Sequence, residues 1–141
     1  MRKIVLASHG GLADGMLNSV RMIYGTCVNK MLVSEHLLQG EDVNILYEKY
    51  KTEVTENPDI NYILVTDIKG GSINTCLLRL LVFPNVELIS GMNMGLILQL
   101  VMEEGDGAFT EEQSLRIIEE ARQGIEYHND LPEPDMPNAD F

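Results

Sequence analysis

Short, mainly apolar runs alternate with segments of helical periodicity along most of the chain. Four such runs have the length and the β-branched content of strands that are buried on both faces of a parallel sheet. They are Ile4–Ala7, Met31–Val33, Ile60–Thr66 and Val86–Ile89. After each run, apolar residues recur every three or four positions, which is the pattern of a helix that packs one face on a core. The sequence therefore predicts four consecutive units of strand followed by helix.

Glycines and polar residues mark where the helices are expected to begin and end. The first helix is expected to end at Gly25, and later helices to follow Gly40-Glu41-Asp42, to run from Gly70-Gly71-Ser72 through Leu81, and to span about Asn93 to Met102. Thr110, followed three residues later by Gln113, has the spacing of a capping box. It predicts a last helix that ends near Tyr127.

The alternation of strands and helices predicts one α/β domain. Because crossovers between parallel strands are right-handed, the expected architecture is a single doubly wound, mainly parallel sheet with helices on both faces. The flavodoxin-like strand order 2-1-3-4 is the predicted topology. We assign this domain to residues 1–128. The segment 129–141 is an acidic tail with three of the chain's five prolines, and it is expected to be mobile or to lie along a neighbouring molecule.

Composition and charge restrict the class of protein and of partner. Of 141 residues, 45% are hydrophobic and 23% are charged, which is ordinary usage for a globular domain. No apolar run approaches the ~18 residues of a membrane span, and the N-terminus lacks a secretory pattern, so a cytoplasmic location is expected. The net charge of −12 would repel the phosphates of DNA or RNA, and no nucleic-acid partner is expected.

Cysteines and methionines are predicted to serve packing. Cys27 and Cys76 are far apart and do not have the spacing of metal ligands, which suits two unpaired thiols in a reducing compartment. Both are expected to be small buried side chains. The eight methionines lie at helical spacing and are expected in the core.

Two candidate catalytic residues fall at strand ends. His9 follows the first strand and Asp67 the third, and ligands of open α/β sheets bind beyond the carboxyl ends of the strands. If these strands are neighbours, the imidazole and the carboxylate meet. A carboxylate that accepts a hydrogen bond from Nδ1–H would leave the Nε2 lone pair free as a nucleophile. Ser8 is expected to point the other way, because side chains alternate along a strand.

Glycine-rich loops stand beside both candidates. Gly10 and Gly11 precede one helix, and Gly70, Gly71 and Ser72 precede another. Backbone N–H groups at such positions can hold phosphoryl oxygens, and phosphoryl transfer depends mainly on positioning and electrostatic support. The glycine spacing fits neither a dinucleotide fold nor a P-loop. The pattern predicts a phosphorylated histidine without a nucleotide, metal or other cofactor.

Each of these residues also has a structural alternative. His9 is compatible with a turn residue, Asp67 with a helix N-cap or loop acid, and the two glycines at 70 and 71 with a tight turn. His36 is a further candidate, which with His9 and Asp67 would form a metal site of a hydrolase. Its three ligands would come from separate loops without the usual ligand spacing. His128 is expected to be a surface residue near the end of the last helix.

Three stretches of the chain resemble the enzyme IIA component of the mannose-type sugar phosphotransferase system. They are IVLASHGGLADGMLNSVRMIYG (Ile4–Gly25), LVTDIKGGSINT (Leu64–Thr75) and ISGMNMGLILQL (Ile89–Leu100). The resemblance covers about residues 1 to 128. It implies a phosphocarrier that accepts a phosphoryl group from the small protein HPr and passes it to an enzyme IIB partner, for sugar uptake by membrane subunits.

The resemblance also implies roles for individual residues. The phosphohistidine of the family matches His9, its orienting aspartate matches Asp67, and its Gly-Gly-Ser loop matches Gly70, Gly71 and Ser72. Members of the family commonly form homodimers, so a homodimer is expected. The same fold and histidine serve the phosphotransfer subunit of dihydroxyacetone kinase, which is an alternative. A non-catalytic regulatory module that binds small anions is an alternative of another class.

Three positions depart from the family pattern. Ile73 and Gly95 stand where members often carry proline, and Leu12 stands where close relatives often have a bulky aromatic residue. The two proline positions lose a fixed φ, which points to differences in the partner surface or the sugar subfamily. The nucleophile and its orienting acid are unchanged.

Overall fold

The computed structural model describes residues 1–130, in which strands and helices alternate in the predicted order. The strands are β1 (Arg2–His9), β2 (Leu32–Leu37), β3 (Asn61–Thr66) and β4 (Val86–Ser90), and the helices are α1 (Leu12–Tyr24), α2 (Val43–Glu56), α3 (Ser72–Leu77), α4 (Met94–Met102) and α5 (Glu111–Gln123). Short 3₁₀ helices lie at Thr26–Lys30, Leu78–Val82 and His128–Asp130. Nearly all of the predicted C-terminal tail, residues 131–141, lies outside the described residues.

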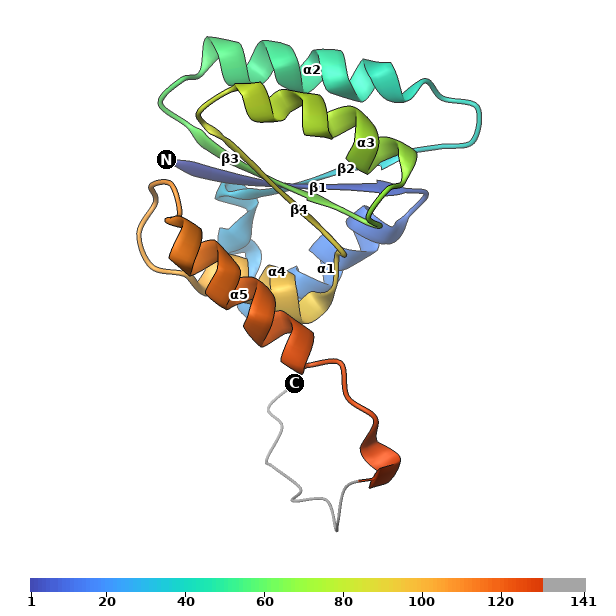
Figure 1. The fold of residues 1–141 in the computed structure, drawn as a ribbon, viewed down its shortest axis with the longest axis vertical. Coiled ribbons are helices and arrows are strands. Elements are labelled where there is room, and N and C mark those ends of the chain that lie inside the picture. The colour runs from blue at the N-terminus through green and yellow to red at the C-terminus, as the bar shows by residue number, and fades with distance from the viewer. Residues whose placement is uncertain (131–141) are drawn as a thin grey trace.

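The four strands form one parallel sheet in the order β2-β1-β3-β4. This confirms the predicted α/β fold class and strand order. Helices α2 and α3 cover one face of the sheet, and α1, α4 and α5 cover the other (Figure 1). Among residues 1–130, no helix is both long enough and apolar enough to cross a lipid bilayer.

Both faces of the sheet are buried, which explains the unbroken apolar runs. In β1, Ile4 and Leu6 enter one hydrophobic cluster, together with side chains of α1, α4 and α5. Val5 and Ala7 enter the other cluster, which includes side chains of α2 and α3. Successive strand residues point to opposite faces, so a strand between two helical layers needs apolar residues at every position.

The register of the sheet brings two strand ends together. Ala7 of β1 lies beside Thr66 of β3, and His9 lies beside Leu37 of β2. Neighbouring parallel strands are about 4.8 Å apart. The segments that follow Ala7 and Thr66 therefore leave the sheet side by side at the same edge.

Strand β2 is longer than predicted. It continues past Val33 to Leu37, because its polar residues find partners on the two helical layers. The Ser34 hydroxyl donates to Asp14 Oδ1 at 2.7 Å, and Glu35 Oε1 accepts from the Tyr50 hydroxyl at 2.7 Å. At the edge of a sheet such side chains do not interrupt pairing.

Two helical predictions need correction. The helix expected to run through Leu81 is α3, which ends at Leu77 and continues as a 3₁₀ helix. The last helix begins at the predicted capping box, but it ends at Gln123 and not near Tyr127. There the N–H groups of Gly124 and Ile125 donate to carbonyl oxygens three residues earlier, which tightens the chain into a final turn.

The burial of the sulfur-containing residues was predicted only in part. Cys76 is buried as expected, but Cys27 is exposed, and its Sγ donates to the carbonyl oxygen of Tyr24 at 3.5 Å. Met22 of α1 and Met102 of α4 are also exposed. Both lie on outward faces of helices whose core positions are already filled by neighbouring apolar residues. The expectation that all the methionines lie in the core is therefore wrong.

Candidate active site

The side chain of His9 is held by Asp67. Asp67 Oδ2 lies 2.7 Å from His9 Nδ1 and accepts the backbone N–H of His9 at 2.8 Å. The Asp67 side chain is 10% exposed, whereas that of His9 is 49% exposed. Because an ionised carboxylate only accepts hydrogen bonds, Nδ1 carries the proton in the neutral ring. The remaining nitrogen, Nε2, then holds a lone pair on a side chain that is half exposed.

Asp67 is an anion at neutral pH. Burial is the largest influence on its pKa and raises it, but the hydrogen bonds from the His9 backbone and ring and from the Ile68 backbone together lower it more. The net pKa of Asp67 is therefore below the ordinary value for aspartate. The second oxygen, Oδ1, accepts the N–H of Ile68 at 2.9 Å, so both carboxylate oxygens are fixed.

This lowered pKa predicts a loss of stability in acid. The contribution of ionised Asp67 is complete above the pKa of the unfolded chain, about 3.9, and is lost as the pH falls through the lower folded-state pKa. Urea denaturation of the wild type and Asp67→Asn from pH 7 to pH 2 is expected to show a stability gap that narrows only below about pH 4. A gap that stays constant down to pH 2 would contradict this prediction.

Ser72 and Gly71 face the other side of the imidazole. The Ser72 Oγ lies 3.0 Å from His9 Nε2. At Gly71, an added Cβ would lie 2.9 Å from Ile68 Cγ2 and 3.6 Å from His9 Cε1. A larger residue at this position would therefore press on the loop and approach the ring. His9 is held between the carboxylate that follows β3 and the first residue of α3.

The two glycine-containing loops, after β1 and after β3, have an unusual backbone conformation, and some of their N–H groups have no acceptor. Gly10 and Gly70 have positive φ angles of 55° and 79°, which other residues rarely adopt. Their N–H groups already have acceptors, Leu37 O at 2.9 Å and Asn74 Oδ1 at 3.1 Å, and the N–H of Gly71 donates to Ile68 O at 3.2 Å. Within residues 1–130, the N–H groups of Gly11 and Ser72, at the starts of α1 and α3, have no acceptor.

Ser8 points away from the site, as predicted. Its side chain is buried, and its Oγ accepts the N–H of Ala13 at 2.7 Å. It therefore links the end of β1 to the first turn of α1.

Asn74 plays a similar part for the loop between β3 and α3, and the sequence analysis did not identify it. Its Oδ1 accepts the Gly70 N–H, and its side chain is buried. The only available signal was a polar amide at a position that the helical pattern places among apolar residues.

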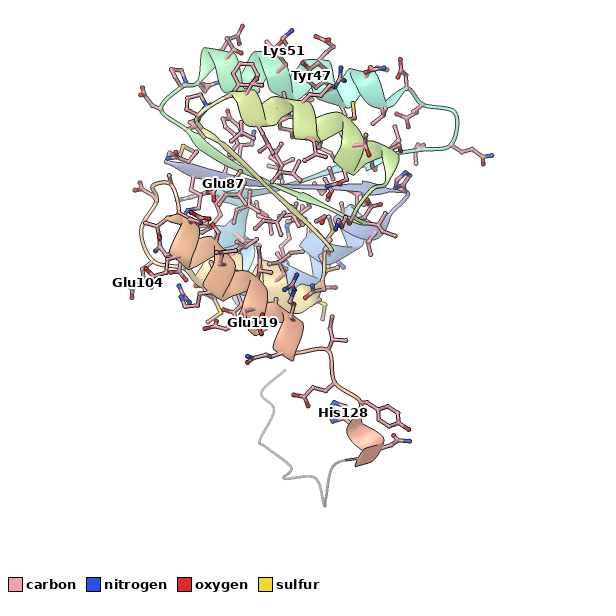
Figure 2. All side chains as sticks on the ribbon, viewed as in Figure 1. Tyr47, Lys51, Glu87, Glu104, Glu119 and His128 are labelled. Atoms are coloured by element: carbon pink, nitrogen blue, oxygen red, sulfur yellow. The ribbon has the colours of Figure 1, made fainter. Side chains whose placement is uncertain are left out.

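His36 is separate from the pair formed by His9 and Asp67. Its Nδ1 lies 3.3 Å from Asp14 Oδ2, on the side of the sheet covered by α1. In the part of the chain that the structure describes, no group of three or more His, Cys, Asp or Glu side chains is arranged to hold a metal ion. His128 lies beyond α5, away from the sheet (Figure 2), and it is exposed.

Comparisons with known proteins agree on one family. The model of the family EIIA-man, described as PTS system fructose IIA component, matches residues 3–117. The sorbose-specific EIIA component of the PTS of Klebsiella pneumoniae is 31% identical over 98 residues, which cover 69% of this chain and 70% of that relative. The match includes both sides of the site, since residues 3–117 contain all but the first residue of β1, all of β3 and the loops that follow them.

Solved structures have the same fold. Phosphotransferase system component EIIA from Streptococcus agalactiae superposes with a TM-score of 0.79 at 23% identity, over 92% of this chain and 98% of that one. The PTS IIA protein associated with the fucose utilization operon of Streptococcus pneumoniae gives 0.75 at 29% identity, over 91% and 93% of the two chains. With most of the chain matched by the family model, this protein belongs to the mannose-type (EIIA-man) family of phosphotransferase system IIA components.

Proposed function

We propose that this protein is a phosphocarrier that accepts a phosphoryl group on His9 from phosphorylated HPr and passes it to an enzyme IIB partner. The observation that carries the proposal is the fixed and half-exposed imidazole, with Nδ1 2.7 Å from Asp67 Oδ2 and Nε2 3.0 Å from the Ser72 hydroxyl. Family membership supports the general role of a phosphotransferase component. A cytoplasmic location is part of the proposal, because both protein partners must reach the same site.

In the proposed reaction the Nε2 lone pair attacks the phosphorus of the donor. A bond forms between Nε2 and phosphorus while the bond from phosphorus to the donor breaks, and the donor leaves with that electron pair. Nδ1 keeps its proton, so the ring gains positive charge, which the Asp67 carboxylate stabilises. Transfer to the IIB partner repeats these steps in reverse, and no metal, nucleotide or other cofactor takes part.

The loops would hold the phosphoryl oxygens during transfer. The free N–H groups of Gly11 and Ser72 lie at helix N-termini, where backbone dipoles favour an anion. The Ser72 hydroxyl, now 3.0 Å from Nε2, would turn to donate to a phosphoryl oxygen. In this proposal Gly10, Gly70 and Gly71 contribute through loop shape, because their own N–H groups are engaged.

Exposed apolar residues around His9 suit a protein partner. Leu12, Leu38 and Ile68 follow the ends of β1, β2 and β3 and are 46%, 53% and 61% exposed. A partner that covers these side chains would exclude water from the phosphoryl group, which limits loss by hydrolysis. Donor and acceptor would use this face in turn, since there is one nucleophile to reach.

We include a homodimer in the proposal, and its test is independent of the chemistry. Within the described residues β4 pairs on one side only, and a hollow beside it is lined by residues that include Leu88, Ser90, Ile118, Arg122 and Ile125. An open strand edge beside an apolar hollow is a surface that a second chain can extend. Light scattering after size exclusion is expected to give twice the monomer mass at micromolar concentration, and a monomer mass would remove the dimer.

The proposed function is tested by intact-mass spectrometry at neutral pH. The protein is incubated with phosphoenolpyruvate, enzyme I and HPr, and a matched sample omits enzyme I. One acid-labile phosphoryl group is expected only in the complete mixture. No phosphoryl group in the presence of cognate HPr would favour an anion-binding regulatory module. Transfer of the phosphoryl group to a soluble dihydroxyacetone kinase, but not to an enzyme IIB, would favour that alternative.

A further inference from the structure

A buried amide lies directly beneath the loop that carries Asp67 and leads to Ser72. Asn74 is 5% exposed. Its Oδ1 accepts the N–H of Gly70 at 3.1 Å, and its Nδ2 donates to the Oγ1 of Thr66, also buried, at 2.9 Å. The same side chain therefore binds the end of β3 and the middle of the loop.

These two hydrogen bonds join Asn74 to both ends of the segment from Thr66 to Gly70, which contains Asp67. Asp67 follows Thr66 directly, and Ser72 follows Gly70 by two residues, so both groups that contact the imidazole lie between or next to the points that Asn74 holds. Gly70 has a positive φ, and glycine, which lacks a Cβ, is freer than other residues to change conformation. The bond from Asn74 fixes the loop at this permissive position.

Core packing alone does not account for an asparagine here. Neighbouring positions in α3 carry Ile73, Cys76 and Leu77, all buried. Burying an amide gives little net stability even when it is hydrogen-bonded, and an apolar residue would fill the same space. What an apolar residue does not supply is a connection that fixes the loop in one conformation.

We propose that Asn74 is a positioning residue of the phosphotransfer site, which holds the loop of residues 67–72 so that Asp67 and Ser72 contact opposite nitrogens of His9. The inference rests on the proposed function for its kinetic consequence, but not for its structural one. Without Asn74, the loop samples several conformations, and the two contacts to the ring are no longer formed together. Misplacement of a reacting group by about 1 Å can reduce a rate about 100-fold.

The test compares Asn74→Leu with Val54→Ala in the full chain. Leucine has the same branching and the same number of heavy side-chain atoms as asparagine, and it removes both hydrogen bonds. Val54 is buried near the end of α2, and its carbonyl oxygen accepts a hydrogen bond from Asn85, just before β4 begins. It therefore lies near the amino ends of the strands, so its truncation lowers stability without touching the loop. Two properties are measured for each variant: the ¹⁵N chemical shifts of the His9 ring across a pH titration, and the single-turnover rate of phosphorylation by HPr.

The expected result is a specific change in Asn74→Leu. Its His9 ring shifts should move toward those of a free imidazole, and its rate should fall by about 10- to 100-fold, while Val54→Ala resembles the wild type in both. Ring shifts and rate unchanged in Asn74→Leu, or changed equally in Val54→Ala, would overturn the proposal. If Asn74→Leu does not fold, Thr66→Val, which removes only the hydroxyl acceptor, is expected to show the same change of ring shifts to a smaller extent.

The two proposals fail in different ways. If the wild type takes no phosphoryl group from HPr, the proposed function is wrong, and the ring shifts still decide whether Asn74 positions the site. If the wild type is phosphorylated and the ring shifts of Asn74→Leu and Thr66→Val match the wild type, only the role of Asn74 is wrong.

Discussion

Replacement of His9 by alanine is expected to abolish phosphorylation by HPr. The imidazole of His9 has a fixed partner on one nitrogen, since Nδ1 is engaged by Asp67 at 2.7 Å, and its other nitrogen, Nε2, can attack once the Ser72 hydroxyl, 3.0 Å away, turns aside. The neighbouring Ser72 hydroxyl would have no base to activate it once the ring is gone. Intact-mass spectrometry and ³¹P NMR should therefore detect no phosphoryl group on His9→Ala under conditions that label the wild type fully.

A matched histidine provides the control. His36 is 48% exposed and His9 is 49% exposed, and each has its Nδ1 near a carboxylate. If only the presence of an exposed imidazole mattered, His36→Ala would impair labelling as well. We expect His36→Ala to be labelled like the wild type. A phosphoryl group that persists on His9→Ala and disappears in His36→Ala would assign the nucleophile to the other pair and contradict the proposal.

Loss of His9 should affect chemistry more than folding. Its side chain is half exposed and lies outside both hydrophobic clusters. Urea denaturation of His9→Ala at pH 7 should therefore remain cooperative, with a small change in midpoint from the lost contact to Asp67. This separates a missing nucleophile from a misfolded site.

The layers of the fold were predictable because a strand that is buried on both faces has apolar residues at successive positions. The run at Ile4–Ala7 contains no polar residue, as a strand between two helical layers requires. The capping box at Thr110 and Gln113 was also predictable, because it is formed by residues three apart in the chain. Such patterns can be recognised in the sequence because the residues that cause them are close together in the chain.

The end of a helix and the burial of a single side chain were not predictable in the same way. The end of α5 is set by bonds among Ala121, Arg122 and the residues after them, and Ile125 fitted the helical period although it lies in solvent. Cys27 is exposed, and this depends on the path of the segment between α1 and β2. A single residue of this kind carries no periodic signal.

The meeting of His9 with Asp67 followed from strand order, but the state of each loop did not. Whether the N–H of Gly10 is free depends on Leu37, a residue of another strand, and the N–H of Gly70 depends on the rotamer of Asn74. Sequence spacing predicted five loop residues as one phosphoryl-binding set. The three-dimensional structure separates those whose N–H groups are free from those that shape the loop.

Asp67→Asn is expected to reduce the rate of phosphoryl transfer on the order of 10²- to 10⁴-fold. Asp67 accepts three hydrogen bonds, two at Oδ2 from the His9 backbone and ring and one at Oδ1 from the Ile68 N–H. An asparagine offers one oxygen and one NH₂ group, so either orientation sets a donor against a donor. The ring would lose its preferred tautomer, and the charge that develops on it would lose its counter-ion.

The effect is measured as the single-turnover rate of phosphorylation by HPr at pH 7, with Asp14→Asn as the matched control. Asp14 lies 3.3 Å from a ring nitrogen of His36, so the same atoms are exchanged at the other Asp–His pair of the described chain. Asp14→Asn should retain a rate near that of the wild type. Equal losses in the two variants would mean that general changes in charge, and not the orientation of His9, control transfer. A large loss in Asp67→Asn alone, with folding intact, would mean that the carboxylate acts through the ring it holds.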